Sequence, residues 1–144
     1  MVGSAGGSRG RVRGPARSRL GSMRCEEVSG WLERYVAAWK SGERGAIESL
    51  FSDDARYRYH SYDEPVVGRA AIADSWLDDP DEPGSFDARY ECFAADGDAV
   101  VAIGTSTYFK ADGEVDRVYD NVFVLRFETG GRCSDFTEWY AKRP

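Results

Sequence analysis

Apolar side chains recur at helical spacing where the Gly/Ser/Arg-rich start of the chain ends. From residue 26 to residue 40 the pattern places one apolar face on a helix, formed by Val28, Trp31, Leu32, Tyr35, Val36 and Trp39. Gly42 follows as a stop signal. The sequence therefore predicts an amphipathic helix over 26–40, and we expect a second, short helix over 45–51.

The pattern then becomes extended before a last helical segment. Over residues 52–62 alternation places Tyr57 and Tyr59 on one side of a strand. The sequence then predicts a turn over 63–68, a third helix over 69–77 and an acidic, proline-punctuated loop over 78–85. Three helices thus precede most of the extended segments.

The second half consists of extended runs separated by Asp-Gly and Gly-Gly turns. The runs cover residues 86–94, 99–110, 115–127 and 132–143. Such turns between β-branched and aromatic residues predict an antiparallel meander. Gly104, in the middle of one run, indicates a bend that curves the sheet. Helices first and strands later indicate an α+β fold.

Charge divides the chain into two parts. Residues 1–24 contain six arginines and no acidic residue, and their Gly/Ser-rich composition predicts a disordered tail. Residues 25–144 carry 13 basic and 25 acidic side chains, a formal charge of 13 − 25 = −12, and are expected to form one domain. The tail is open to three interpretations: a solvated tail or a start upstream of Met23, a transit peptide, or a nucleic-acid-binding arm. Because the domain is acidic, we do not expect it to bind nucleic acid.

Cysteine and histidine content bears on location and cofactors. The three cysteines, Cys25, Cys92 and Cys133, are odd in number and widely separated, so we expect reduced thiols in a soluble, cytoplasmic protein. The most apolar stretch is too short to cross a membrane. With one histidine, a zinc site lacks ligands, and we expect no metal and no cofactor.

A family resemblance rests on three segments. Residues 34–59, "RYVAAWKSGERGAIESLFSDDARYRY", continue without a gap to "PVVGRAAI" at 65–72, and a weaker match follows at 122–132. These segments resemble ketosteroid isomerases, SnoaL-like polyketide cyclases and the wider nuclear transport factor two-like superfamily. The resemblance implies a cone in which three N-terminal helices pack on a strongly curved, mostly antiparallel sheet. This superfold carries many unrelated activities, so the resemblance does not settle the reaction.

The isomerases within this superfamily use a helical Tyr, a protonated Asp that binds an oxyanion, and a second Asp that moves the proton. In this sequence the helical Tyr corresponds to Tyr35. The proton-moving Asp falls on Tyr59, followed by His60 where the family has Pro, and the oxyanion Asp falls on Phe123. Two of the three chemical positions are therefore replaced, and we do not expect isomerisation by that constellation.

Aromatic residues with polar tips are the candidates for a ligand site. Inward-facing positions predicted to bind a ligand are Trp39, Tyr57, Tyr59, Trp76, Tyr90, Tyr108, Tyr119, Asn121, Phe123 and Trp139. Aromatic walls with a few polar groups are typical of an apolar small-molecule site. Ordinary core packing is the alternative for each of them. Tyrosines favour a polar cavity, because each buried hydroxyl needs a partner.

Three residues are candidates for catalysis. Tyr35 would donate a hydrogen bond to a ligand oxygen, and either His60 or Glu138 would carry a proton. If Tyr59 faces the cavity, strand alternation turns His60 away unless a bulge intervenes. Either Glu138 or Trp139 faces inward. A buried Glu138 would have a raised pKa, whereas the alternative is an ion pair with an arginine on a neighbouring strand.

Two functions remain in competition. The first is a SnoaL-like protein that binds an apolar, oxygen-bearing molecule of polyketide, steroid or terpenoid type, either with or without cofactor-free acid/base catalysis. The second is a non-catalytic member whose cone is filled by aromatic side chains and whose sheet face forms a homodimer. The resemblance implies a homodimer in both cases, and we expect no membrane partner. Motifs for nucleophilic hydrolases and phosphate-binding loops are missing.

Overall fold

The computed structural model describes residues 22–144, so most of the predicted tail, residues 1–21, lies outside the described residues. Met23 already belongs to the domain. Its side chain is buried, and its backbone N–H donates to the Gly97 carbonyl at 2.9 Å. The folded domain therefore includes residues just before the predicted boundary at Cys25.

The three predicted helices are confirmed. They are α1 (Cys25–Ser41), α2 (Arg44–Ser49) and α3 (Arg69–Asp78). Helix α1 ends at Gly42, whose φ of 64° lies in the left-handed region that glycine adopts without strain. The buried face of α1 contains Val28, Trp31, Leu32, Tyr35 and Ala38. It agrees with the predicted apolar stripe except that Val36 and Trp39 are only half-buried.

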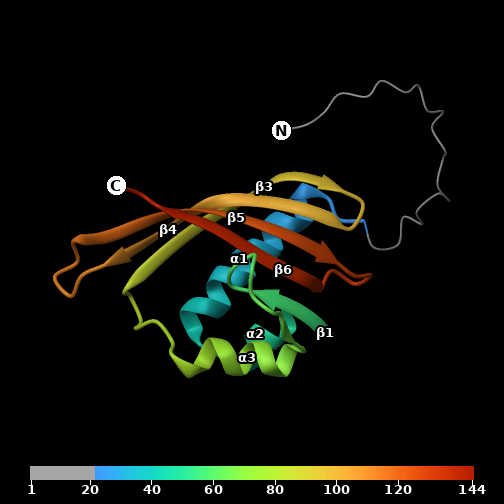
Figure 1. Ribbon diagram of the computed structural model, residues 1–144, viewed down its shortest axis with the longest axis horizontal. Coiled ribbons are helices and arrows are strands. Elements are labelled where there is room, and N and C mark those ends of the chain that lie inside the picture. The colour runs from blue at the N-terminus through green and yellow to red at the C-terminus, as the bar shows by residue number, and fades with distance from the viewer. Residues whose placement is uncertain (1–21) are drawn as a thin grey trace, which may run out of the picture.

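The strands form one six-stranded, curled sheet. They are β1 (Phe51–Arg58), β2 (Val66–Val67), β3 (Phe86–Asp96), β4 (Ala99–Phe109), β5 (Val115–Phe127) and β6 (Cys133–Lys142). Their spatial order is β2-β1-β6-β5-β4-β3, and every neighbouring pair is antiparallel except β1 and β6. Helix α1 lies against the inner face of the long strands, with α2 and α3 beyond it (Figure 1). The α+β cone implied by the resemblance is confirmed, and the sequence missed only the short β2.

Gly104 marks a close approach between two strands. It pairs with Tyr90 across β3 and β4. A Cβ at this position would lie 2.0 Å from the Arg89 carbonyl oxygen and 2.8 Å from the Tyr90 Cα. Any side chain here would displace backbone, so glycine is needed where Tyr90 crosses the neighbouring strand.

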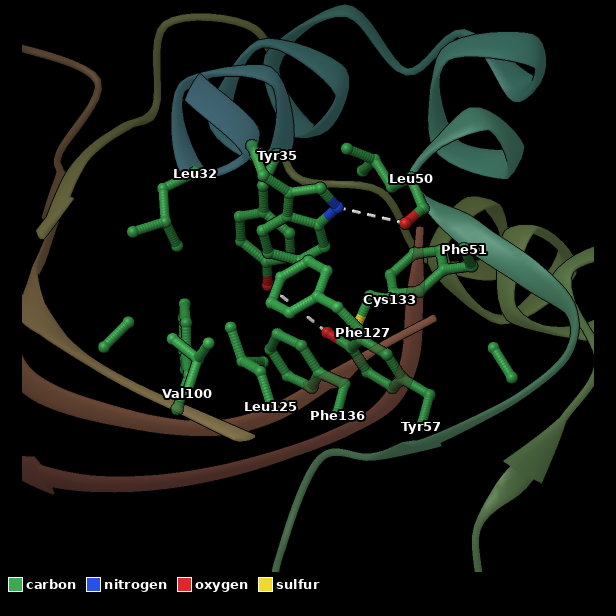
Figure 2. Packing of buried hydrophobic residues seen from close by; sticks show 14 of the residues in the cluster. Leu32, Tyr35, Leu50, Phe51, Tyr57, Val100, Leu125, Phe127, Cys133 and Phe136 are labelled. Carbon is green, nitrogen blue, oxygen red and sulfur yellow. Dashed lines mark hydrogen bonds between the residues drawn. The ribbon is translucent and has the colours of Figure 1, made fainter. Parts of the chain in front are cut away.

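The core fills the space between α1 and the inner face of the sheet. Trp31, Phe51, Phe127 and Phe136 are among its largest fully buried side chains, and Figure 2 shows several of these rings packed together. The indole Nε1 of Trp31 donates to the Leu50 carbonyl at 3.0 Å, which ties α1 to the start of β1. Burying an aromatic ring of this size stabilises the fold by about 2–3 kcal/mol.

The expectation of three reduced cysteines is wrong for two of them. Cys25 and Cys92 form a disulfide with a Cα–Cα distance of 5.3 Å. The first residue of α1 lies beside β3, and 67 residues of sequence separate the two sulfurs, so spacing along the chain gave no sign of the pairing. Cys133 is free and buried. The cytoplasmic location stays a prediction, since the cysteines no longer argue for it. Within residues 22–144 no helix is long and apolar enough to cross a bilayer.

Candidate functional site

A cavity of about 270 Å³ lies between α1, α3 and the inner face of the sheet. Eight of the predicted site residues line it: Tyr35, Trp39, Tyr57, Tyr59, Trp76, Tyr90, Tyr108 and Glu138. The other lining residues are Gly42, Ile47, Ser75, Leu77, Asp79, Pro80, Asp81 and Ser106. The cavity is therefore walled mainly by aromatic rings that come from both helices and strands.

Two tyrosine hydroxyls meet in the cavity wall. The hydroxyls of Tyr35, on α1, and Tyr57, on β1, are 3.3 Å apart (Figure 2). Both rings stack on Phe136, at centroid distances of 5.6 and 4.3 Å. Burial raises the pKa of both hydroxyls well above the ordinary value. Both groups therefore stay protonated, and when one donates to the other, the second O–H remains available to a ligand.

Glu138 is the carboxyl group within this aromatic enclosure. Burial raises its pKa to about 7, while a hydrogen bond from Asn121 and the charge of His60 oppose that shift. The Asn121 amide Nδ2 donates to the Glu138 carboxyl at 2.8 Å, and the Ser106 hydroxyl donates to the Asn121 Oδ1 at 3.0 Å. The chain Ser106–Asn121–Glu138 fixes the amide orientation and holds the carboxyl in place.

The remaining aromatic residues close the cavity and reach its rim. The Tyr59 and Ser75 hydroxyls are 2.7 Å apart. The Trp39 indole Nε1 donates to the Asp81 carboxylate at 2.9 Å. The ring of Trp76 is nearly perpendicular to that of Tyr35, with 5.2 Å between centroids. Helix α3 and the loop after it thus complete the wall that the sheet leaves open.

His60 lies outside the cavity lining. Strand β1 ends at Arg58, so His60 stands in the turn that follows. Its Nδ1 is 2.9 Å from the Asp63 carboxylate, and its Nε2 is 2.9 Å from the Tyr140 hydroxyl. The half-exposed imidazole belongs to a surface cluster at the end of β6, and the alternation argument that turned it away from the cavity agrees with this position.

Four further predicted ligand-binding residues do not line the cavity. Trp139 is 45% exposed because alternation along β6 turns Glu138 inward and Trp139 outward. Phe123 is fully buried in the core against Tyr90 and Phe136. Asn121 is buried behind Glu138, and Tyr119 lies against Tyr108 and Tyr140. For these four residues the predicted position at the cavity wall is wrong, although Asn121 supports a residue that lines it.

Some lining residues were missed by the sequence. Ser106 lies two positions before Tyr108 on β4, so strand periodicity could have found it. Ser75 precedes Trp76 on α3. Asp79 and Asp81 stand in the acidic loop, where nothing in the sequence tells an acid at a cavity rim from a solvated one. Among residues 22–144 no group of three or more His, Cys, Asp or Glu is placed to hold a metal ion.

The raised pKa of Glu138 predicts a pH-dependent stability. The folded state binds the proton more tightly than the unfolded state, whose pKa is near 4.5, so the stabilising contribution is complete below about pH 4.5. It is lost as the pH rises to about 7. We expect the free energy of unfolding of the wild type, relative to Glu138→Gln, to fall by about 3 kcal/mol over this window. Urea unfolding of both proteins at several pH values measures this, and a difference that stays flat with pH would contradict it.

Glu138 interacts electrostatically with titratable groups on α1, on β1, β3, β4 and β6, and in the turn after β1. They are His60, Tyr35, Tyr57, Tyr59, Tyr90, Tyr108 and Tyr140. The tyrosines stay neutral over the window, because burial raises the pKa of each one.

Solved structures with the same fold include proteins of several descriptions. An NTF-2-like protein of unknown function from Burkholderia xenovorans LB400 has 20% identity and a TM-score of 0.61, covering 83% of this chain and 86% of its own. A protein from Kribbella flavida DSM 17836, provisionally assigned as a ketosteroid isomerase, has 18% identity and a TM-score of 0.58. The match covers 83% of this chain and 82% of the Kribbella protein. An LEH-like epoxide hydrolase from M. tuberculosis has 16% identity and a TM-score of 0.59. The match covers 81% of this chain and 84% of the hydrolase. At these identities the likeness shows the fold alone.

Sequence comparison with characterised proteins gives no match. The model of the SnoaL-like domain family matches residues 32–136, which includes α1 from Leu32 onward and the sheet as far as Phe136 on β6. The match covers most of the chain and agrees with the cone described above. This protein therefore belongs to the SnoaL-like domain family.

Proposed function

We propose that this protein binds a small, mainly apolar molecule bearing an oxygen atom and moves a proton on it by acid/base catalysis without a cofactor. The observation that carries the proposal is the Glu138 carboxyl, buried in an aromatic cavity with a pKa of about 7. A carboxyl group with this pKa can both accept and return a proton near neutral pH. The structures of isomerase and epoxide hydrolase relatives are compatible with proton transfer on this fold.

The size of the cavity limits the ligand. A volume of about 270 Å³ lies just below the range of about 300–1,000 Å³ that is typical of pockets for drug-sized ligands. That space suits a ligand on the order of ten non-hydrogen atoms, such as a monocyclic terpenoid or a cyclic ketone. A steroid or polycyclic polyketide would extend through the mouth. Within the predicted ligand classes, the cavity favours the terpenoid-sized one.

The chemical roles follow from the positions of the groups. Glu138, as carboxylate, would remove a proton from the carbon next to a ligand carbonyl, and the electron pair would move onto the carbonyl oxygen. Tyr35 or Tyr57 would donate a hydrogen bond to that oxygen, because both hydroxyls stay protonated. Glu138 would then return the proton at another carbon. The ligand is thereby isomerised, and no other reactant is consumed.

Between the two predicted proton carriers, the proposal assigns the role to Glu138. His60 does not line the cavity, and both of its ring nitrogens are engaged, with Asp63 and Tyr140. Its charge still lowers the pKa of Glu138. In this proposal His60 adjusts the proton carrier and does not touch the ligand.

Turnover of a small unconjugated ketone tests the assignment. With 3-cyclohexen-1-one as probe, conjugation of the double bond is followed by ultraviolet absorbance. We expect Glu138→Gln to lower kcat by at least about 100-fold, because the amide cannot accept the proton. Tyr35→Phe should lower it by about tenfold, since Tyr57 keeps one donor in place. The wild-type kcat/KM should rise with pH through a midpoint of about 7.

Glu128→Gln is the matched control for this experiment. It removes a carboxylate in the turn between β5 and β6, where the side chain is exposed. The control should retain full activity. Equal turnover by Glu138→Gln and Glu128→Gln would remove Glu138 from the chemistry.

A specific observation also favours the predicted homodimer, which the second candidate function requires. On the outer face of the sheet, Val122, Val124 and Trp139 are 38, 40 and 45% exposed. Val122 pairs with Trp139 on one side and Ile103 on the other, so the apolar side chains form a continuous row across three strands. We propose that a second copy of the chain covers this row. The cavity argues against the filled cone of the non-catalytic alternative.

Mass measurement tests the dimer. Analytical ultracentrifugation of the wild type should give twice the chain mass of 16.0 kDa. Val122→Asp combined with Val124→Asp should give the monomer mass, because the interface would then bury two carboxylates. Val115→Asp, near one end of the same strand and 55% exposed, is the control and should leave the dimer intact. A wild type of monomer mass would contradict the proposal.

A further inference from the structure

The outer part of the cavity contains acidic and aromatic side chains that have no role in the proposed proton transfer. Two acids of the loop after α3, Asp79 and Asp81, line it together with Trp39 and Tyr108. The rings of Trp39 and Tyr108 lie 6.3 Å apart at an angle of 62°. Asp79 and Asp81 are exposed and the two rings are half-buried, so we call these four residues the outer end of the cavity. The buried pair of Tyr35 and Tyr57, together with Glu138, is the inner end.

The charge at the outer end is not balanced by the protein. No ion pair joins Asp79 or Asp81 to a basic side chain within residues 22–144. Three basic residues of the neighbouring segments are paired elsewhere. Lys40, which follows Trp39 in sequence, bonds to Asp87 at 2.7 Å, Arg44 bonds to Glu48 and Asp74, and Arg69 bonds to Asp53 at 3.1 Å. Among the sixteen residues that line the cavity, three are acidic and none is basic. The side chains that line the cavity therefore carry negative charge only.

Tyr108 already holds a cation. The guanidinium carbon of Arg117 lies 4.3 Å from the centroid of the Tyr108 ring. Cations are attracted to the electron-rich face of an aromatic ring, and the attraction is strongest for tryptophan and for rings shielded from water. Trp39 and Tyr108 are both half-buried, and the Trp39 indole is held in place by Asp81 at 2.9 Å. Phe86 stacks on Trp39 at 3.9 Å, and the Arg117 that lies over Tyr108 is itself paired with Asp116. A ligand cation would therefore use the parts of the two rings that line the cavity.

Charged groups from both ends of the cavity act on the hydroxyl of Tyr108. Burial is the main cause that raises its pKa to about 12, and the charges of Asp81 and of Glu138 raise it further. Tyr108 thus stands within electrostatic reach of the outer acid and of the proposed proton carrier. A single small ligand could contact both ends of a cavity of about 270 Å³.

From this arrangement we infer that the ligand carries a positively charged nitrogen, an amine or a quaternary ammonium group, which sits between Trp39, Tyr108, Asp79 and Asp81. The inference rests on the proposed function, because it assumes that the ligand's oxygen lies at the tyrosine pair and Glu138. It adds the substrate class: a molecule with a cationic nitrogen at one end and an oxygen at the other. The acidic domain, with a formal charge of −12 over residues 25–144, would also attract such a molecule from solution.

A pair of isosteres tests the inference directly. Choline and 3,3-dimethylbutan-1-ol have the same shape and the same hydroxyl group. They differ in one atom, since choline has a quaternary nitrogen where the alcohol has a carbon. Binding is measured by isothermal titration calorimetry at low salt. We expect choline to bind at least about tenfold more tightly than the alcohol, a difference that lies between the strengths of an exposed and of a desolvated cation–aromatic contact.

Variants locate the preference within the cavity. Asp79→Asn combined with Asp81→Asn keeps the shape of both side chains, and an amide oxygen can still accept the bond from Trp39. In this variant the ratio of the choline affinity to the alcohol affinity should fall toward one. The control is Glu114→Gln combined with Glu128→Gln, which removes the same charge from exposed turns and should leave the ratio unchanged. Circular dichroism establishes that both variants are folded.

The outcomes separate this inference from the proposed function. Equal affinities for choline and the alcohol would overturn the cationic nitrogen and leave the proton transfer by Glu138 standing. A choline preference that survives in the Asp79 and Asp81 variant would overturn the assigned position. Absence of binding by both compounds at millimolar concentration would overturn the subsite, whereas the proposed function is decided separately by the turnover of Glu138→Gln.

Discussion

A carboxyl group enclosed by aromatic rings is the constraint on which this structure depends. Glu138 has one hydrogen bond to a side chain of the protein, from Asn121, and that bond does not offset the loss of hydration. An isolated charge in such surroundings is costly, so the carboxyl holds its proton up to neutral pH. The surrounding tyrosines stay neutral for the same reason. Burial therefore gives the cavity a carboxyl group that can exchange a proton near neutral pH and several hydroxyl groups that keep theirs.

The rest of the fold keeps that carboxyl in position. Phe136 stacks against Tyr35 and Tyr57, so the two hydroxyls that face the cavity are fixed by rings in the core. Gly104 lets Tyr90 cross β4 without displacing backbone. The cavity is thus continuous with the core: the same aromatic side chains bury their rings on one side and present their hydroxyls on the other.

The sequence predicted the fold more completely than the site. The three helices and the long strands follow from apolar periodicity and Gly-containing turns, which are local signals, and the family resemblance supplied the cone. Helical and strand alternation also placed Tyr35, Tyr57 and Tyr90 correctly. Glu138 and Trp139 are neighbours on β6, and only the register of β6 against β5 decides which of them faces inward.

Other features depend on contacts between distant segments. The disulfide joins Cys25 to Cys92 because α1 packs on β3. Phe123 fills the core instead of the cavity because Tyr90 and Phe136 pack against it. Asp79 and Asp81 reach the cavity because the loop after α3 lies at its rim. No spacing along the chain encodes these contacts, so pattern alone could not have found them.

The central claim is that Glu138 exchanges a proton near neutral pH, and a direct titration tests it. Carbon-13 NMR of the glutamate side-chain carboxyl groups, with the Glu138 signal identified by its loss in Glu138→Gln, follows the protonation of this single group. The account predicts a midpoint at about pH 7. It also predicts a higher midpoint in Asn121→Leu, because the hydrogen bond that favours the carboxylate is removed. A midpoint near the ordinary value of 4.5 in the wild type would contradict the account.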